Sequence, residues 1–246
     1  KELRKQTADY YNCMSRLDTL IGDLLNALNE SGKADNTFIA YIGDHGADML
    51  RGKRTSYEGG TRVPFIIRWP GHTKTNKVNA ELVSLIDLAP TVLEATGADL
   101  IPHLPGRSLI PLLKGEHTGW RTHLFTEFHI HSAHNYYPQR TTQNDRFKLI
   151  LNLMPGIINP GYQFTNNRFF DELNQTINEA PEPIRSAYYQ MERPARFQLY
   201  DLKNDPHEFN NLANDPKHSR ILADLQTRLQ QWRVETNDPM LDYNNV

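Results

Sequence analysis

An aspartate and a histidine stand side by side after an apolar segment. Asp44 and His45 follow segment 38–42 and lie between Gly43 and Gly46. The segment is typical of a buried strand, and the glycines allow a sharp turn at its end. Ligands of open α/β sheets bind beyond the carboxyl ends of strands, where a carboxylate and an imidazole can hold a divalent cation. Asp44 and His45 are therefore candidate metal ligands; the alternative is an Asx-turn beside a surface histidine.

A basic loop that contains glycines follows this turn. Residues 52–64 read Gly-Lys-Arg-Thr-Ser-Tyr-Glu-Gly-Gly-Thr-Arg-Val-Pro and lead into a second apolar segment. The adjacent cations Lys53 and Arg54 can both donate hydrogen bonds to a tetrahedral anion such as sulfate or phosphate. The alternative is a solvated loop without a ligand.

The first part of the chain alternates between helical and strand-like patterns. Apolar residues recur at helical spacing over residues 17–28 and predict an amphipathic helix that ends at Ser31-Gly32. Segments 37–42 and 63–67 predict strands that are buried on both faces of a mostly parallel sheet, and a further helix is expected over residues 87–96. This alternation predicts an α/β fold.

The pattern changes near residue 115. Segments 124–130, 147–153 and 196–201 predict strands of a smaller antiparallel sheet, separated by long loops rich in asparagine and proline. Apolar residues on one face of segment 221–232 predict a C-terminal helix that packs on this sheet. The second part of the chain is therefore expected to be α+β.

Histidines cluster at the start of this second part. Glu127, His129 and His131 alternate along a predicted strand and so share one face, and His134 follows them. Imidazoles and guanidinium groups can hydrogen-bond to sugar hydroxyls, carboxylates and sulfates. The three histidines and Arg140 are therefore candidate substrate-binding residues. The alternatives are a structural zinc site, which no further cysteine supports, and ordinary surface histidines.

Composition narrows the class of protein. The chain has 246 residues, with 27 basic residues, 29 acidic residues and one cysteine. The balanced charge provides no basic field for a phosphate backbone, which argues against a nucleic-acid-binding protein. One cysteine cannot form an internal disulfide. The longest apolar segments fall far short of a membrane span.

The order of the motifs in residues 10–113 resembles the formylglycine-dependent sulfatase family. The resemblance implies an alkaline-phosphatase-like fold. It also implies that Asp44 and His45 bind a divalent metal, usually Ca²⁺, and that Lys53 is a catalytic residue that contacts a sulfate oxygen. The motifs that carry the resemblance are Asp44-His45-Gly46, Gly52-Lys53, residues 57–64, Trp69-Pro70-Gly71 and residues 87–91.

Other parts of the family's site are missing from the chain. The family's nucleophile is a cysteine, oxidised to formylglycine, in the motif Cys-x-(Pro/Ala/Ser)-x-Arg. The fourth residue after Cys13 is Leu17 and not arginine, and the early pair of aspartates that completes the metal site is absent. The resemblance therefore implies a C-terminal half of a sulfatase, with formylglycine in a missing N-terminal half and no turnover by these residues alone.

The second part resembles, more narrowly, the C-terminal region of the heparan N-sulfatases. The similarity includes residues 136–140 and 235–239. Together the two resemblances imply that residues 1–115 are the C-terminal portion of a catalytic α/β domain. Residues 116–246 would then form an α+β subdomain that shapes the substrate cleft.

The implied substrate is a sulfated glycan, with N-sulfoglucosamine of heparan or heparin as the leading choice. His45 and Lys53 resemble instead the members that cleave esters, so O-sulfate ester cleavage stays open. Phosphonate or phosphate ester hydrolysis stays open as well, as does a non-catalytic glycan-binding role. Family members work in lysosomes, in the periplasm or outside cells, and the sequence determines neither the compartment nor the oligomeric state.

Overall fold

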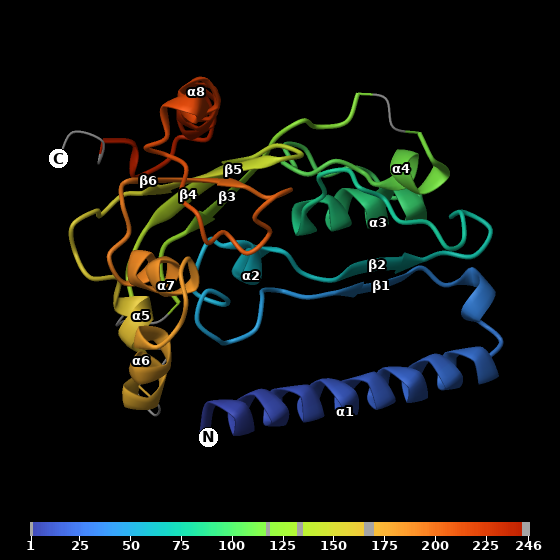
Figure 1. Cartoon of the computed structure of the whole chain (residues 1–246). Coiled ribbons are helices and arrows are strands. Elements are labelled where there is room, and N and C mark those ends of the chain that lie inside the picture. Colours follow the sequence, from blue (N-terminus) through green and yellow to red (C-terminus); the bar gives the residue numbers. More distant parts are fainter. Residues whose placement is uncertain (1, 117–118, 132–134, 165–169, 243–246) are drawn as a thin grey trace.

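The computed structural model describes residues 2–116, 119–131, 135–164 and 170–242. In these residues the strands form a two-stranded sheet, β1–β2, and a four-stranded sheet in the order β3–β4–β5–β6 (Figure 1). The strands are β1 (Ile39–Ile42), β2 (Phe65–Arg68), β3 (Leu124–Phe128), β4 (Gln139–Gln143), β5 (Phe147–Asn152) and β6 (Phe197–Asp201). The helices are α1 (Glu2–Glu30), η1 (Ala34–Asn36), α2 (Glu58–Thr61), η2 (Leu85–Asp87), α3 (Leu88–Thr96), α4 (Ile110–Lys114), α5 (Pro160–Phe164), α6 (Phe170–Asn178), α7 (Ile184–Glu192), η3 (Pro216–His218) and α8 (Ser219–Glu235).

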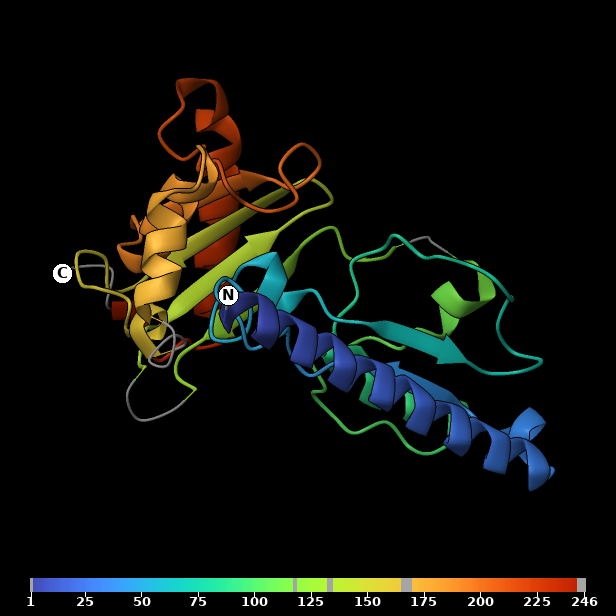
Figure 2. The same cartoon turned by 60° about the horizontal axis from the view of Figure 1, so that its bottom comes forward.

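The first helix is longer than the apolar pattern indicated. α1 includes the predicted segment 17–28, which confirms a helix there, and it forms a long rod at the periphery of the molecule (Figure 2). Its apolar residues stay accessible, with Leu20 65% and Leu24 70% exposed. Cys13 is also exposed on this helix.

The first sheet differs from the expected one. β1 and β2 pair antiparallel, with Ile39 opposite Arg68, so the expected parallel arrangement is wrong for this pair. A parallel pair requires a crossover that returns the chain to the same end of the sheet. Here the connection folds back as a loop that contains only the one-turn helix α2. Ile66 is 61% exposed, so this strand is not buried on both faces within the described residues.

The second sheet is antiparallel throughout and carries apolar residues on both faces. Leu149 and Leu199 pack with Leu225 of α8 on one face. Ile150 and Tyr200 face the opposite way and pack with other elements. The smaller antiparallel sheet, its strands β3, β5 and β6, and the packing of α8 are confirmed as predicted.

The face opposite α8 joins the two parts of the chain. Its core contains Tyr57 from the loop after β1, together with residues of α5, α6 and α7. The aromatic rings of Tyr57 and Tyr200 lie edge to face, with centroids 6.1 Å apart. The second sheet therefore supports the loop that carries the basic motif. Within the described residues, no helix is long and apolar enough to cross a membrane.

Candidate active site

The loop between β1 and β2 brings the two sequence motifs together. The amide of Gly46 donates to the carbonyl of Gly60 at 3.0 Å, and the amide of Lys53 donates to the carbonyl of Ala47 at 2.8 Å. A Cβ atom at position 46 would lie 1.7 Å from the carbonyl oxygen of Gly59. Only glycine permits this close approach of one backbone to another, so the Gly-rich sequence is a requirement of the loop.

Asp44 and His45 place a carboxylate and an imidazole next to each other. The amide of His45 donates to Asp44 Oδ1 at 2.9 Å, and His45 Nδ1 lies 2.9 Å from the carbonyl oxygen of Gly46. In the tautomer in which Nδ1 donates to that carbonyl, Nε2 presents its lone pair 3.2 Å from Asp44 Oδ2. Two electron-rich atoms at this distance are placed to share a cation, either a proton or a metal ion.

The chemistry of this pair fits a hard divalent cation. The Asp44 side chain is 86% exposed, so its oxygens remain open to further coordination. A carboxylate oxygen is a preferred ligand of Ca²⁺, and an orienting hydrogen bond on the second ring nitrogen is typical of a metal-bound histidine. In the part of the chain that the structure describes, no group of three or more histidine, cysteine, aspartate or glutamate side chains could hold a metal. Asp44 and His45 can thus supply only part of a coordination shell.

The two adjacent cations of the basic motif differ in their contacts. Both Nη atoms of Arg54 donate to the carboxylate of Asp48, with Nη2 3.0 Å from Oδ2. Lys53 is partly buried beside this pair and has no ion-pair partner among the described residues. The partner Asp48 was not identified from the sequence, because residues six apart in a loop carry no periodic signal. The Lys53 side chain is therefore available to an anion.

His131 lies within electrostatic range of the same loop. Partial desolvation, followed by the positive charges of Lys53 and Arg54, holds the pKa of His131 below its ordinary value. Asp48 opposes this effect and His45 adds to it. These charges lie within electrostatic range of His131, which itself is exposed.

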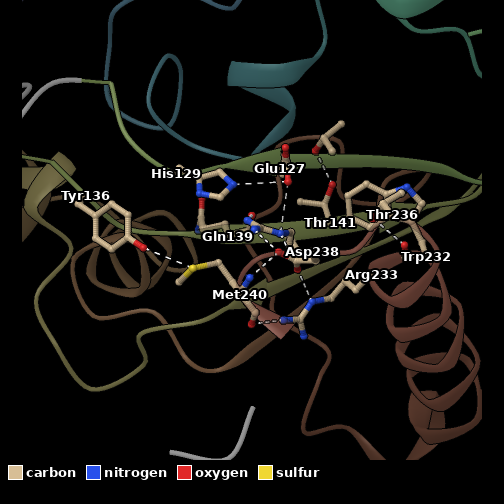
Figure 3. A network of polar contacts seen from close by, with 12 residues as sticks. Glu127, His129, Tyr136, Gln139, Thr141, Trp232, Arg233, Thr236, Asp238 and Met240 are labelled. Carbon is tan, nitrogen blue, oxygen red and sulfur yellow. Dashed lines mark hydrogen bonds and ion pairs between the residues drawn. The ribbon is translucent and has the colours of Figure 1, made fainter. Parts of the chain in front are cut away.

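The structure also gives the contacts of His129 and Arg140. His129 Nε2 contacts Glu127 Oε2 at 3.5 Å, which agrees with the shared face expected of these two residues (Figure 3). His134 lies outside the described residues. Arg140 has no exposed surface, and its guanidinium group is paired with Asp238. A ligand cannot reach a group that is already buried in this way, so the expectation that Arg140 binds substrate is wrong.

Comparisons with known proteins show which family the chain resembles. The family model described as Sulfatase matches residues 1–98, and the model described as N-sulphoglucosamine sulphohydrolase, C-terminal, matches residues 184–235. Similar solved structures belong to sulfatases of the alkaline-phosphatase-like fold, which confirms the expected fold class. The chain belongs to the sulfatase family.

Individual relatives show how the chain relates to longer proteins. N-sulphoglucosamine sulphohydrolase of Homo sapiens is 34% identical over 96% of this chain and 49% of the relative. The structure of a 2-O glycosaminoglycan sulfatase is 26% identical and has a TM-score of 0.69, over 94% of this chain and 42% of that one. A phosphonate monoester hydrolase from Silicibacter pomeroyi is 25% identical with a TM-score of 0.63, over 89% and 38%. The chain thus spans about half the length of its human relative and less of the two solved structures.

Proposed function

We propose that the chain forms the C-terminal portion of a sulfatase that removes sulfate from a sulfated glycan, with N-sulfoglucosamine of heparan as the leading substrate. One observation carries the proposal: a single glycine-dependent loop holds Asp44, His45 and Lys53. Sulfate transfer requires a cation and hydrogen-bond donors close to the sulfuryl oxygens, and these residue types can supply both.

Each residue has a role that follows from its surroundings. Asp44 and His45 would hold the divalent cation, which we assign as Ca²⁺, together with ligands outside this chain. When bound, this ion would neutralise charge on the sulfuryl oxygens. Lys53 donates a hydrogen bond to one sulfate oxygen, because its ammonium group has no competing carboxylate among the described residues. The formylglycine nucleophile would also come from outside these residues, so the chain alone is expected to have no turnover.

Substrate contacts come from the second part of the chain. His131 is held toward its neutral form, in which one ring nitrogen can donate and the other can accept a hydrogen bond from a sugar. His129 contributes a second imidazole, oriented by Glu127. The name of the human relative supports N-sulfoglucosamine, whereas that of the solved 2-O sulfatase supports O-sulfate ester cleavage as a second candidate.

The test compares substrates in the enzyme that contains these residues together with the nucleophile. Release of sulfate from N-sulfoglucosamine and from 6-O-sulfated glucosamine is measured beside hydrolysis of a phosphonate monoester. We expect the highest kcat/KM for N-sulfoglucosamine, loss of activity after chelation, and recovery with Ca²⁺. A higher kcat/KM for the O-sulfate would select the second candidate, and preference for the phosphonate monoester would refute both.

A further inference from the structure

Three buried charged side chains, together with the partly buried Glu58, form a cluster next to the loop of the candidate active site. Lys148 of β5 has no exposed surface, and its Nζ lies 2.9 Å from Glu58 Oε1 and 3.4 Å from Glu208 Oε1. Arg51 is also buried, and it donates to the carbonyl oxygen of Glu208 at 2.7 Å. The cluster contains two cations and two carboxylates, so its charges can balance without solvent.

The contacts of Glu208 reach directly into the loop that carries Lys53. Glu208 Oε2 accepts a hydrogen bond from the amide of Glu58 at 2.6 Å, across 150 residues of sequence. This amide is the first of the one-turn helix α2, which lies within the basic motif. Burial raises the pKa of Glu208, although Lys148 opposes that shift. Burial of the charged carboxylate costs free energy, and its hydrogen bond and ion pair must be well placed to offset this cost.

The turn that carries Glu208 is itself specialised. Glu208 has a positive φ of 57°, in the left-handed region that non-glycine residues seldom adopt. Asp205 fixes the turn, since its carboxylate accepts from the amides of Phe209 at 3.0 Å and Asn210 at 2.7 Å. The left-handed backbone of Glu208 and the hydrogen bonds of Asp205 within this turn orient the Glu208 side chain toward α2.

Two polar side chains of the second sheet also bind residues 56 and 57, next to Glu58. Gln139 Oε1 accepts from the amide of Ser56 at 3.2 Å, and Gln198 Nε2 donates to the hydroxyl of Tyr57 at 3.0 Å. Buried polar side chains of β4, β5 and β6 therefore all bind residues 56–58. One face of the second sheet acts as a support for the loop of the first part.

We propose that Glu208 is a positioning residue, which together with Lys148 holds residues 51–61 so that Lys53 keeps its place against the sulfate. This proposal rests on the proposed function of Lys53. Glu208 itself touches neither substrate nor metal; it acts through the Glu58 amide and the buried ammonium group. Misplacement of a catalytic group by about 1 Å can lower a rate by about 100-fold, so a distant support can control activity.

The test uses two substitutions of Glu208 and a matched control. Glu208→Ala removes the acceptor and the charge, whereas Glu208→Gln keeps an acceptor for the Glu58 amide. The control, Asp87→Asn, disrupts a different buried pair, in which Asp87 binds Arg121 at 2.5 and 2.6 Å. Hydrogen exchange of amides 46–61 is measured in the full chain, and kcat and KM are measured in the enzyme that contains it.

In Glu208→Ala we expect amide exchange in residues 46–61 to accelerate at least about tenfold and kcat/KM to fall by up to about 100-fold. Glu208→Gln should change both the amide exchange and kcat/KM less than Glu208→Ala does. Asp87→Asn should change the stability of the chain without changing amide exchange in residues 46–61. Adding Lys53→Ala should cost less in the Glu208→Ala background than in the wild type, because the two residues act as a unit.

Unchanged exchange in residues 46–61, or equal costs of Lys53→Ala in both backgrounds, would overturn the positioning role. If Glu208→Ala does not fold, Glu208→Gln is judged by the same criteria. Absence of sulfate release by the wild-type enzyme would refute the proposed function instead, and the exchange measurement would still show whether Glu208 holds the loop.

Discussion

Arg140 of β4 and Asp238, which follows α8, form a bidentate ion pair across 98 residues of sequence. Arg140 Nε lies 3.0 Å from Asp238 Oδ2, and Nη2 lies 2.7 Å from Oδ1. Arg233 donates to the same carboxylate at 2.6 Å. Burial opposes ionisation of Asp238, but the hydrogen bonds from Arg140 and Arg233 hold its pKa below the ordinary value. The pair fastens the C-terminal helix to the second sheet.

Asp238→Asn should lower the free energy of unfolding by about 3–5 kcal/mol, because it removes the charged carboxylate that two buried guanidinium groups contact. The control is Asp224→Asn, which removes a solvent-exposed pair with Arg228 and should cost less than about 1 kcal/mol. Denaturant-induced unfolding measures the free energy of unfolding of both variants. Equal losses in the two variants would contradict a structural role of the buried pair.

Acid should weaken a second ion pair. Hydrogen bonds from Arg146 lower the pKa of Asp201 from 3.8 to about 2. A carboxylate whose pKa is lower in the folded state stabilises the fold above its unfolded pKa, and this contribution is lost as the pH falls through the folded pKa. The stability difference between wild type and Asp201→Asn should therefore be present at about pH 6 and shrink between about pH 4 and 2. A difference that does not depend on pH would exclude this linkage.

Gly46→Ala should destabilise the loop of the candidate active site. The new Cβ would meet the carbonyl oxygen of Gly59, and relief of this overlap should cost about 1–3 kcal/mol. Gly22→Ala is the matched control, since its Cβ meets nothing within 4 Å in the interior of α1. It should instead stabilise the helix by about 0.5–1 kcal/mol. Thermal unfolding shows whether each variant is less stable or more stable than the wild type.

Lys53→Ala should lower kcat/KM for the sulfated substrate by about 100-fold, because a donor to the sulfuryl oxygens is lost. Lys203→Ala removes an exposed lysine of the turn after β6 and should leave kcat/KM unchanged. Steady-state kinetics in the enzyme that contains these residues makes the comparison. Wild-type turnover in Lys53→Ala would reject its proposed contact with sulfate.

Asp44→Ala should abolish binding of the divalent metal, since it removes a charged ligand oxygen. Asp99→Ala, an exposed carboxylate outside the loop, should retain the metal. Elemental analysis of the purified enzymes gives the metal content of each variant. An unchanged content in Asp44→Ala would show that Asp44 is not a ligand.

The local sequence pattern was sufficient to predict much of the fold. Segments 124–130, 147–153 and 196–201 predicted β3, β5 and β6. The helix expected over residues 87–96 is α3, which ends at Gly97 with a positive φ of 67°. The polar strand β4 was missed because its sequence, Gln-Arg-Thr-Thr-Gln, has no apolar alternation. Four of its five residues are nevertheless buried, because ion pairs and hydrogen bonds replace their contacts with water.

The sequence by itself determined the family and the motifs Asp44-His45 and Lys53, since these residues are adjacent or nearby in the chain. Only the tertiary structure decided that Arg140 is a buried ion-pair partner and that Glu208 binds the loop of Lys53. The type of a side chain determines which hydrogen bonds and ion pairs it can form. Burial and long-range pairing, which no local spacing encodes, decide which of those bonds it does make.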